Sequence, residues 1–259
     1  MATTKSSPSV IHNMDFPSRK KASTPLGTSL FIILRLADIF LQYKLVSGWG
    51  QTLIESLGGS VTTRYSHRGS TGFSAFHLLI TALAAGSSVK QIIWVFFTSE
   101  QEMPVFGAVM VAGFNTFLNS LNSLLALWSW TSAATVLPTP ALATCLGLVL
   151  YVTGILFEQV SEFQRKTFKA DVRNKGKPYA GGLFSLALNI NYGGYTLWRA
   201  GYACVAAGVG WGVAVGLLFL FDFATRAVPA LDKYCTERYG NEFLQQKKKV
   251  PYRLIPGVY

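Results

Sequence analysis

Residues Phe157–Tyr195 read FEQVSEFQRKTFKADVRNKGKPYAGGLFSLALNINYGGY. This stretch leaves an apolar segment through two acids, crosses a loop with six Lys or Arg residues between Arg165 and Lys177, and then re-enters apolar sequence. A segment that only spans a membrane has no need of acids, cations and an Asn-Tyr-Gly-Gly run in this order, because polar groups are costly there. We therefore interpret the stretch as one edge of a cofactor-binding site.

The composition of the chain indicates a membrane protein. Half of the 259 residues are hydrophobic, 14% are charged, and the mean hydropathy is +0.33, which is more apolar than a soluble domain of this size can bury. The net charge of +11 comes from cations that gather between apolar segments, as in juxtamembrane loops, so we do not expect a nucleic-acid partner. The three dispersed cysteines predict neither a disulfide framework nor a metal site.

We expect an all-α, polytopic bundle of about six transmembrane helices in a single membrane-embedded domain, residues 26–259. Residues 1–25 are expected to be a disordered tail, and the polar break at residues 86–91 to interrupt the second span or join two short helices. The cation distribution predicts that both termini are cytosolic, with the endoplasmic reticulum as the expected location. The expected spans are residues 28–46, 71–98, 104–130, 141–157, 183–207 and 211–227.

Several polar side chains lie inside these expected spans. Arg35 and Asp38 are three residues apart, so they can pair on one helical face that points into the bundle. Asn115, Asn119 and Asn122 line another face, either as an interhelical hydrogen-bond zipper or as the polar wall of a substrate-binding cavity.

Two acids stand just before the helix that carries these asparagines. Glu100 and Glu102 lie in a short turn at the expected membrane boundary. A loop carboxylate is commonly only solvated, but at this place either one is also a candidate proton donor or substrate anchor.

Three blocks of sequence carry a family resemblance. The C-terminal run Asp232-x-x-Cys235-x-x-Arg238-Tyr-Gly, followed by Val-Pro-Tyr252-Arg253-x-x-Pro, resembles the closing signature of membrane sterol reductases. Glu158-x-x-Ser-Glu-x-Gln-Arg-x-x-Phe-Lys is similar to a run of the steroid 5-alpha-reductase-like family, and Gly-Leu-Phe continuing to Asn-Tyr falls where that family has related motifs. The resemblance covers Glu158 to the C-terminus and, more weakly, residues 90–123.

The resemblance implies an all-helical reductase whose residues 158–259 bind NADPH and deliver hydride to a carbon-carbon double bond in a steroid, terpenoid or other lipophilic substrate. In addition to the two loop acids, Tyr192 is implied as a proton donor or stacking residue. The implied partners are a lipophilic small molecule and membrane lipid, and no metal is expected. The residues implied for the cofactor are Glu158, Glu162, Arg165, Lys169, Asn191, Tyr195, Arg226, Asp232, Arg238, Tyr252 and Arg253.

The chain departs from that family pattern at two places. Leu188-Asn189 replaces an Arg-His pair, and Tyr195 replaces a glutamate. An arginine that binds phosphate contributes strong charge-assisted hydrogen bonds, so its loss weakens the reductase interpretation. A non-redox isomerase or cyclase and a non-catalytic sterol-binding scaffold therefore stay open as alternatives. The related isoprenylcysteine methyltransferases would use S-adenosylmethionine, but the C-terminal signature favours the reductases.

Overall fold

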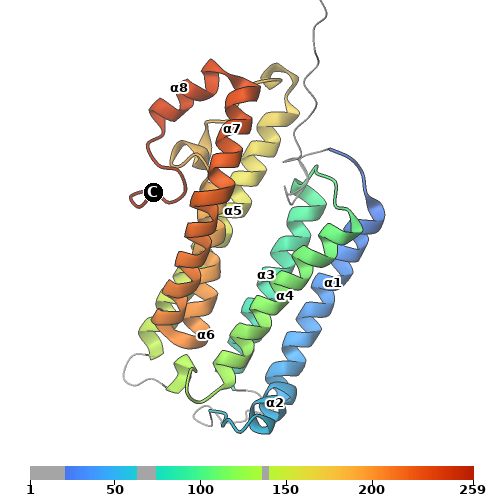
Figure 1. The fold of residues 1–259 in the computed structure, drawn as a ribbon, viewed down its shortest axis with the longest axis vertical. Helices are drawn as coiled ribbons and strands as arrows, with labels where there is room; N and C mark the ends of the chain where they lie inside the picture. The colour runs from blue at the N-terminus through green and yellow to red at the C-terminus, as the bar shows by residue number, and fades with distance from the viewer. Residues whose placement is uncertain (1–20, 63–73, 136–139) are drawn as a thin grey trace, which may run out of the picture.

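The structure is a computed structural model that describes residues 21–62, 74–135 and 140–259, so most of the predicted N-terminal tail lies outside the described residues. Within these ranges the chain is helical, and extended backbone pairs only in isolated bridges. The all-helical prediction is thus confirmed (Figure 1). The α-helices are α1 Pro25–Lys44, α2 Gly50–Ser56, α3 Ala75–Ile93, α4 Val105–Leu127, α5 Pro140–Ala170, α6 Ile190–Asp222, α7 Val228–Tyr239 and α8 Asn241–Lys249.

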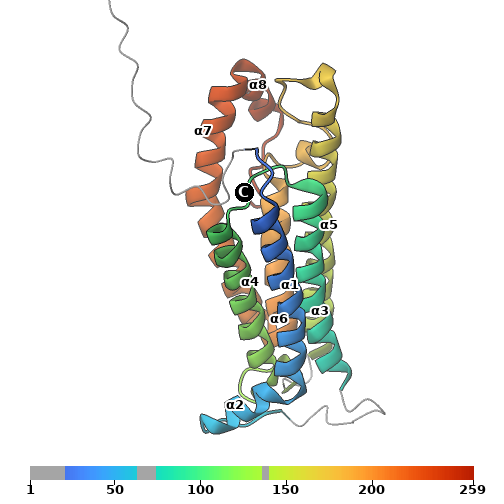
Figure 2. The ribbon, with the colours of Figure 1, turned by 90° about the vertical axis from the view of Figure 1, so that its right-hand side faces the viewer.

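The helices form two groups that lie side by side. Helices α1, α3 and α4 make one group, while α5, α6 and α7 make the other (Figure 1). Helix α2 lies across the end of the bundle opposite α8, as the second view also shows (Figure 2). The end of α5, the basic loop after it and α8 therefore share one end of the molecule.

Helix α6 is a hairpin of two arms, residues 190–206 and 209–222. Ala207 and Gly208 have non-helical backbone angles, and Gly208 has φ 85° and ψ 177°. Beyond this point Gly212 lies against Cys204, and Gly216 lies against Ala200, so the second arm runs back along the first. The short connection that the expected spans 183–207 and 211–227 leave at residues 208–210 is confirmed.

Glycines allow α5 and the first arm of α6 to approach closely along the most extensive helix pair of the fold. A Cβ atom on Gly154 would lie 2.3 Å from the backbone nitrogen of Trp198, and one on Gly147 would lie 2.7 Å from the carbonyl oxygen of Gly201. Small residues at such contacts let helix backbones pack tightly in membranes, where apolar side chains alone give little preference for association.

Four predicted boundaries are wrong. The expected span 183–207 becomes α-helical only at Ile190, after a separate short turn at Gly182–Ser185. Helix α3 runs unbroken through residues 86–91, because Ser87, Ser88, Lys90 and Gln91 are buried and bond to neighbouring helices. Helix α5 continues past residue 157 to Ala170, and the second arm of α6 continues through a π-helical turn, Phe223–Ala227, into α7. Each predicted end lay where the sequence changes from apolar to polar. A helix can continue through such a change when the polar side chains find hydrogen-bond partners.

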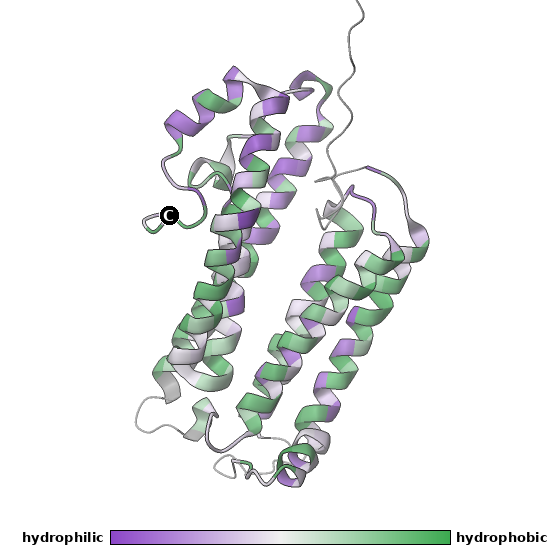
Figure 3. Ribbon diagram, in the orientation of Figure 1, coloured by the Kyte–Doolittle hydropathy of each residue, from purple (hydrophilic) through white to green (hydrophobic). Residues whose placement is uncertain are grey.

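Three of the described helical stretches are long and apolar enough to cross a membrane, namely Ala75–Thr98, Leu142–Ala170 and Ile190–Tyr239. The third contains both arms of α6. Helices α1 and α4 place polar side chains at buried positions, and the apolar colour covers much of the long helices (Figure 3). Large apolar side chains such as Phe106, Phe117 and Leu217 are exposed, as expected of an integral membrane protein.

Candidate functional site in the polar interior

The predicted pair of Arg35 and Asp38 on α1 is confirmed. The guanidinium Nη2 lies 2.9 Å from the Asp38 carboxylate, and both side chains are buried. The same carboxylate accepts hydrogen bonds from Gln42, Ser88 and Asn119 at 2.9, 3.1 and 2.7 Å. With several donors around it, this buried acid ties α1 to α3 and α4.

The three asparagines of α4 are buried and make interhelical hydrogen bonds. Asn119 donates to Asp38, and Asn122 accepts a bond of 2.9 Å from the indole of Trp211. The Oδ1 atom of Asn115 accepts from Gln91 at 2.6 Å and from Arg199. These hydrogen bonds join α4 to α1, α3 and α6.

A second ion pair connects the two helix groups. Lys90 on α3 donates to Glu158 on α5 at 2.5 Å, and the other oxygen of Glu158 accepts a bond of 2.7 Å from the Trp198 indole on α6. The Lys90 ammonium also lies 4.9 Å from the centroid of the Trp198 ring. Buried pairs of this kind need such added bonds, because removing two charges from water is costly.

One turn further along α5, Glu162 makes the next polar contact with α6. Its carboxylate is almost fully buried and accepts hydrogen bonds from Asn191 at 2.8 Å and from Arg165. The predicted residues Glu158, Glu162, Arg165 and Asn191 thus lie along one contact between α5 and the start of α6.

Tyr195 links this contact to the asparagines. Its hydroxyl lies 3.5 Å from Oδ1 of Asn115 and accepts a bond of 3.2 Å from Arg199, while its ring packs on Trp198 and Phe219. The residue that departs from the reductase pattern is therefore part of the buried hydrogen-bond network.

The three predicted catalytic residues lie elsewhere. Glu100 is exposed and pairs with Lys21, and Glu102 is half-buried in the same turn before α4. Tyr192 stacks on Phe223, with ring centroids 4.8 Å apart, and is half-buried between α6 and the π-helical turn. The structure does not bring the two acids to the asparagines, because Asn115 lies almost three turns into α4.

The predicted cofactor-binding cations each bond a group of the chain itself. Arg226 pairs with Asp222 and Arg253 pairs with Asp232, which also binds Lys247. In the same region Lys169 donates to the Tyr239 hydroxyl and to the Lys177 carbonyl, and Arg238 donates to the Tyr234 hydroxyl. The structure therefore gathers these predicted residues near α7 and α8, where Arg226 and Arg253 have acidic partners and Lys169 and Arg238 bond neutral groups.

The C-terminal segment docks onto the place where the sequence departs from the reductase pattern. The backbone N–H of Leu188 donates to the Tyr252 carbonyl at 3.0 Å, and the backbone and side chain of Asn189 both donate to the Arg253 carbonyl. Leu254 is fully buried behind them, against Gly193. Leu188-Asn189 therefore contacts the tail of the chain.

Several buried polar atoms have no hydrogen-bond partner among the described residues. They include the side-chain oxygens of Gln91, Thr98, Asn191 and Gln246 and both amide atoms of Gln159. Buried polar atoms are normally paired, so unpaired ones mark a place where a ligand or water can bond. Gln159 follows Glu158 in the sequence, and Asn191 donates a hydrogen bond to Glu162.

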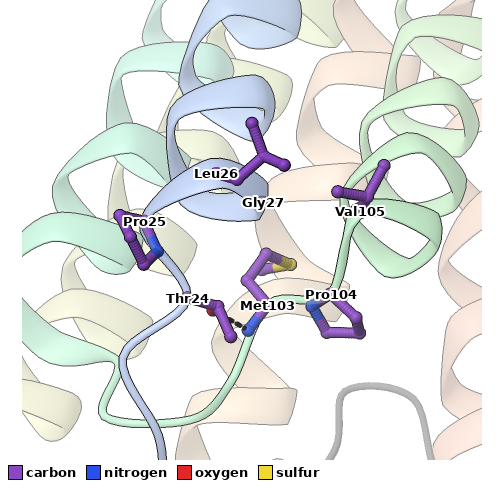
Figure 4. A pocket seen from close by; sticks show the side chains of 7 residues that line it. All are labelled: Thr24, Pro25, Leu26, Gly27, Met103, Pro104 and Val105. Carbon is purple, nitrogen blue, oxygen red and sulfur yellow. Dashed lines mark hydrogen bonds between the residues drawn. The ribbon is translucent and has the colours of Figure 1, made fainter.

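Two surface hollows lie outside this network. One of about 230 Å³ is formed by the start of α1 and the segment before α4, where Thr24 bonds the Met103 backbone at 2.7 Å (Figure 4). The other, of about 510 Å³, lies on α5 between Phe163, Phe168 and Tyr179. Neither hollow is lined by a predicted site residue.

Sequence reasoning missed two buried cations of the interior, Lys90 and Arg199, which are 4% and 1% exposed. The signal was present, because each is a charged residue inside an apolar stretch and such residues are rare unless they are paired or functional. Among the residues that the structure describes, no cluster of His, Cys, Asp or Glu could hold a metal ion.

The fold and this interior define a class: a helical integral membrane protein with a buried, charged network between two helix groups. The chain belongs to the DUF1295 family, described as a protein of unknown function, whose model matches residues 103–250. It is also similar to the protein named "Probable O-methyltransferase ustE" of Ustilaginoidea virens, with 38% identity over 247 residues, which cover 89% of this chain and 86% of that protein.

Proposed function

We propose that the protein is a membrane O-methyltransferase that uses S-adenosylmethionine and a lipophilic acceptor. One observation carries this proposal: Glu158 and Glu162 lie one turn apart at the contact of α5 and α6, beside the unpaired amide atoms of Gln159 and Asn191. Carboxylates are the usual partners of ribose hydroxyls, and unpaired amides can bond an adenine or amino-acid group. The name of the relative from Ustilaginoidea virens supports the same transferase chemistry.

The charge of the site is the second argument. A dinucleotide phosphate needs several uncommitted cations, whereas Arg165, Arg226 and Arg253 are each paired with a carboxylate of the chain. Of the predicted cofactor cations, Lys169 and Arg238 bond neutral groups. S-adenosylmethionine carries a positive sulfonium and no phosphate, so it does not need a set of free cations. The residues present therefore suit an adenosyl cofactor better than a phosphate-rich one.

When bound, S-adenosylmethionine would supply an electrophilic methyl group. Glu162 would orient the cofactor by accepting hydrogen bonds, and Asn191 would offer its unpaired oxygen as a further acceptor. The apolar surroundings of the helix bundle would exclude water from the acceptor oxygen.

Calorimetry on the purified full-length chain in detergent tests this proposal. We expect saturable binding of S-adenosylhomocysteine and a loss of about ten-fold or more in affinity for Glu162→Gln, since a hydrogen bond to a charged group is removed. The matched control is Glu55→Gln, which changes an exposed acid on α2 and should leave binding unchanged. Absence of binding at millimolar S-adenosylhomocysteine would refute the methyltransferase.

The second candidate is NADPH-dependent reduction of a double bond. The C-terminal signature favours it, because Tyr252 and Arg253 dock beside residues 187–189, next to the start of α6. Titration with NADPH in the same calorimeter separates the two functions. Saturable NADPH binding that is lost in Arg253→Gln, without binding of S-adenosylhomocysteine, would support the reductase.

A further inference from the structure

Arg199 stands at the centre of the polar interior, on the first arm of α6. Its side chain is 1% exposed, and its guanidinium lies 4.2 Å from the centroid of the Trp198 ring. Its hydrogen bonds go to Oδ1 of Asn115, to Oδ1 of Asn119 at 3.2 Å and to the Tyr195 hydroxyl at 3.2 Å. All three of these acceptors are neutral.

The other buried cations of the interior have acidic partners. Arg35 pairs with Asp38, and Lys90 pairs with Glu158. In the described part of the chain no carboxylate forms an ion pair with Arg199, although it bonds side chains from two helices. A buried cation without a counter-ion is unfavourable in an apolar bundle, and charged residues kept inside a membrane commonly serve a ligand.

The geometry around Arg199 leaves bonding capacity for an anion. A guanidinium has five N–H groups, and the three hydrogen bonds named above leave two of them to donate. The rings of Trp198 and Tyr195 flank it at 4.2 and 5.4 Å, so the guanidinium lies in aromatic surroundings.

We propose that Arg199 binds an anionic oxygen of the lipophilic acceptor, so that the substrate is an acidic compound such as an ionised phenol, enol or carboxylic acid. This rests on the proposed function, in that the bound oxygen is the one that receives the methyl group. The acceptor loses its proton to bulk water before it binds; its anionic oxygen then forms a bond to the methyl carbon, and the methyl-sulfur bond breaks with its electron pair staying on sulfur. Arg199 keeps the oxygen ionised until the transfer.

Two aromatic probes of the same size test the proposal on the full-length chain in nanodiscs of zwitterionic phosphatidylcholine. The first is 2-naphthoate, an anion at pH 7, and the second is 2-naphthamide, which is neutral; binding is followed by quenching of tryptophan fluorescence. We expect the anion to bind about ten-fold tighter or more, as a charge-assisted hydrogen bond to a guanidinium predicts. Equal affinity for the two probes would overturn the proposal.

Two substitutions assign that preference to Arg199. Arg199→Gln should reduce the affinity for 2-naphthoate to that for 2-naphthamide, whereas Arg173→Gln, which changes an exposed cation, should keep the ten-fold difference. Asn115→Asp supplies the missing carboxylate at an atom that Arg199 already bonds. It should therefore abolish the anion preference even if Arg199→Gln fails to fold. Retention of the preference in folded Asn115→Asp protein would refute the assignment.

The outcome is separable from that of the proposed function. Binding of S-adenosylhomocysteine is measured on the same samples and should be unchanged in Asn115→Asp, because Asn115 bonds Gln91, Tyr195 and Arg199 but neither Glu162 nor Asn191. Anion selectivity that depends on Arg199, without any binding of S-adenosylhomocysteine, would uphold the acidic ligand and reject the methyltransferase. Binding of S-adenosylhomocysteine without anion selectivity would support the methyltransferase and reject the acidic ligand.

Discussion

Lys90 and Glu158 form a buried ion pair of 2.5 Å between helices that are 68 residues apart in the chain. The pair joins α3 of one helix group to α5 of the other, and the indole of Trp198 bonds the second carboxylate oxygen from α6. The Glu158 carboxylate therefore connects three helices through an ion pair and a hydrogen bond. Such polar contacts specify which helices pack together, because apolar surfaces alone specify little in a membrane.

Removing one member of this pair should destabilise the protein strongly. Lys90→Met leaves the Glu158 charge buried without its counter-ion, and we expect a loss of about 3–5 kcal/mol in the free energy of unfolding. Unfolding in mixed detergent, followed by circular dichroism, measures it.

The double substitution Lys90→Met with Glu158→Gln is the control, because it removes both charges together. It should cost clearly less than the sum of the two single substitutions, since the members of a contacting pair are energetically coupled. Additive costs would show that the two residues do not interact.

Removing the charge of a buried acid should reduce the stability of the protein more than breaking an exposed ion pair does. Asp38→Asn removes the charge that Arg35 and Asn119 bond, and we expect a loss of about 3–5 kcal/mol in stability. Asp222→Asn breaks the exposed pair with Arg226 and should cost less than about 1 kcal/mol. Comparable losses, measured by the same unfolding assay, would contradict the placement of Asp38 inside the bundle.

Docking of the C-terminal segment should depend on the absence of a side chain at residue 193. A Cβ atom on Gly193 would lie 2.1 Å from the carbonyl oxygen of Leu254, so Gly193→Ala must push the segment away. We expect a loss of about 1–3 kcal/mol in stability and faster proteolysis after residue 249.

Gly113→Ala is the matched control, because a Cβ atom there meets nothing within 4 Å. It should leave proteolysis unchanged and favour the helix slightly, as alanine has the higher helix propensity. Identical protease resistance of both variants and the parent protein would contradict the docked tail.

The reversal inside α6 should require glycine at residue 208. Its φ of 85° with ψ of 177° is a conformation that side chains strongly disfavour, so Gly208→Ala should cost about 1–3 kcal/mol in stability. Gly210→Ala, two residues later in open space, should be neutral or slightly stabilising. A thermal midpoint that shifts equally in both variants would argue against the hairpin.

The sequence by itself determined the features that depend on local spacing. Apolar segments of sufficient length required a helical membrane fold, because a backbone in lipid must satisfy its own hydrogen bonds. The three-residue interval between Arg35 and Asp38 set their pairing on one face of α1, and the glycines after Ala207 marked the turn of the hairpin.

Only the tertiary structure decided which distant groups meet. Helix packing brings Lys90 to Glu158, and it brings Arg199 to Asn115, which is 84 residues away in the chain. The separation of two residues along the chain does not tell which helices pack together. The same packing turned the polar run of α3 inward, where its side chains are bonded and the helix needs no break. A buried polar group is favourable only when its partner is in place, and that partner is supplied by another helix.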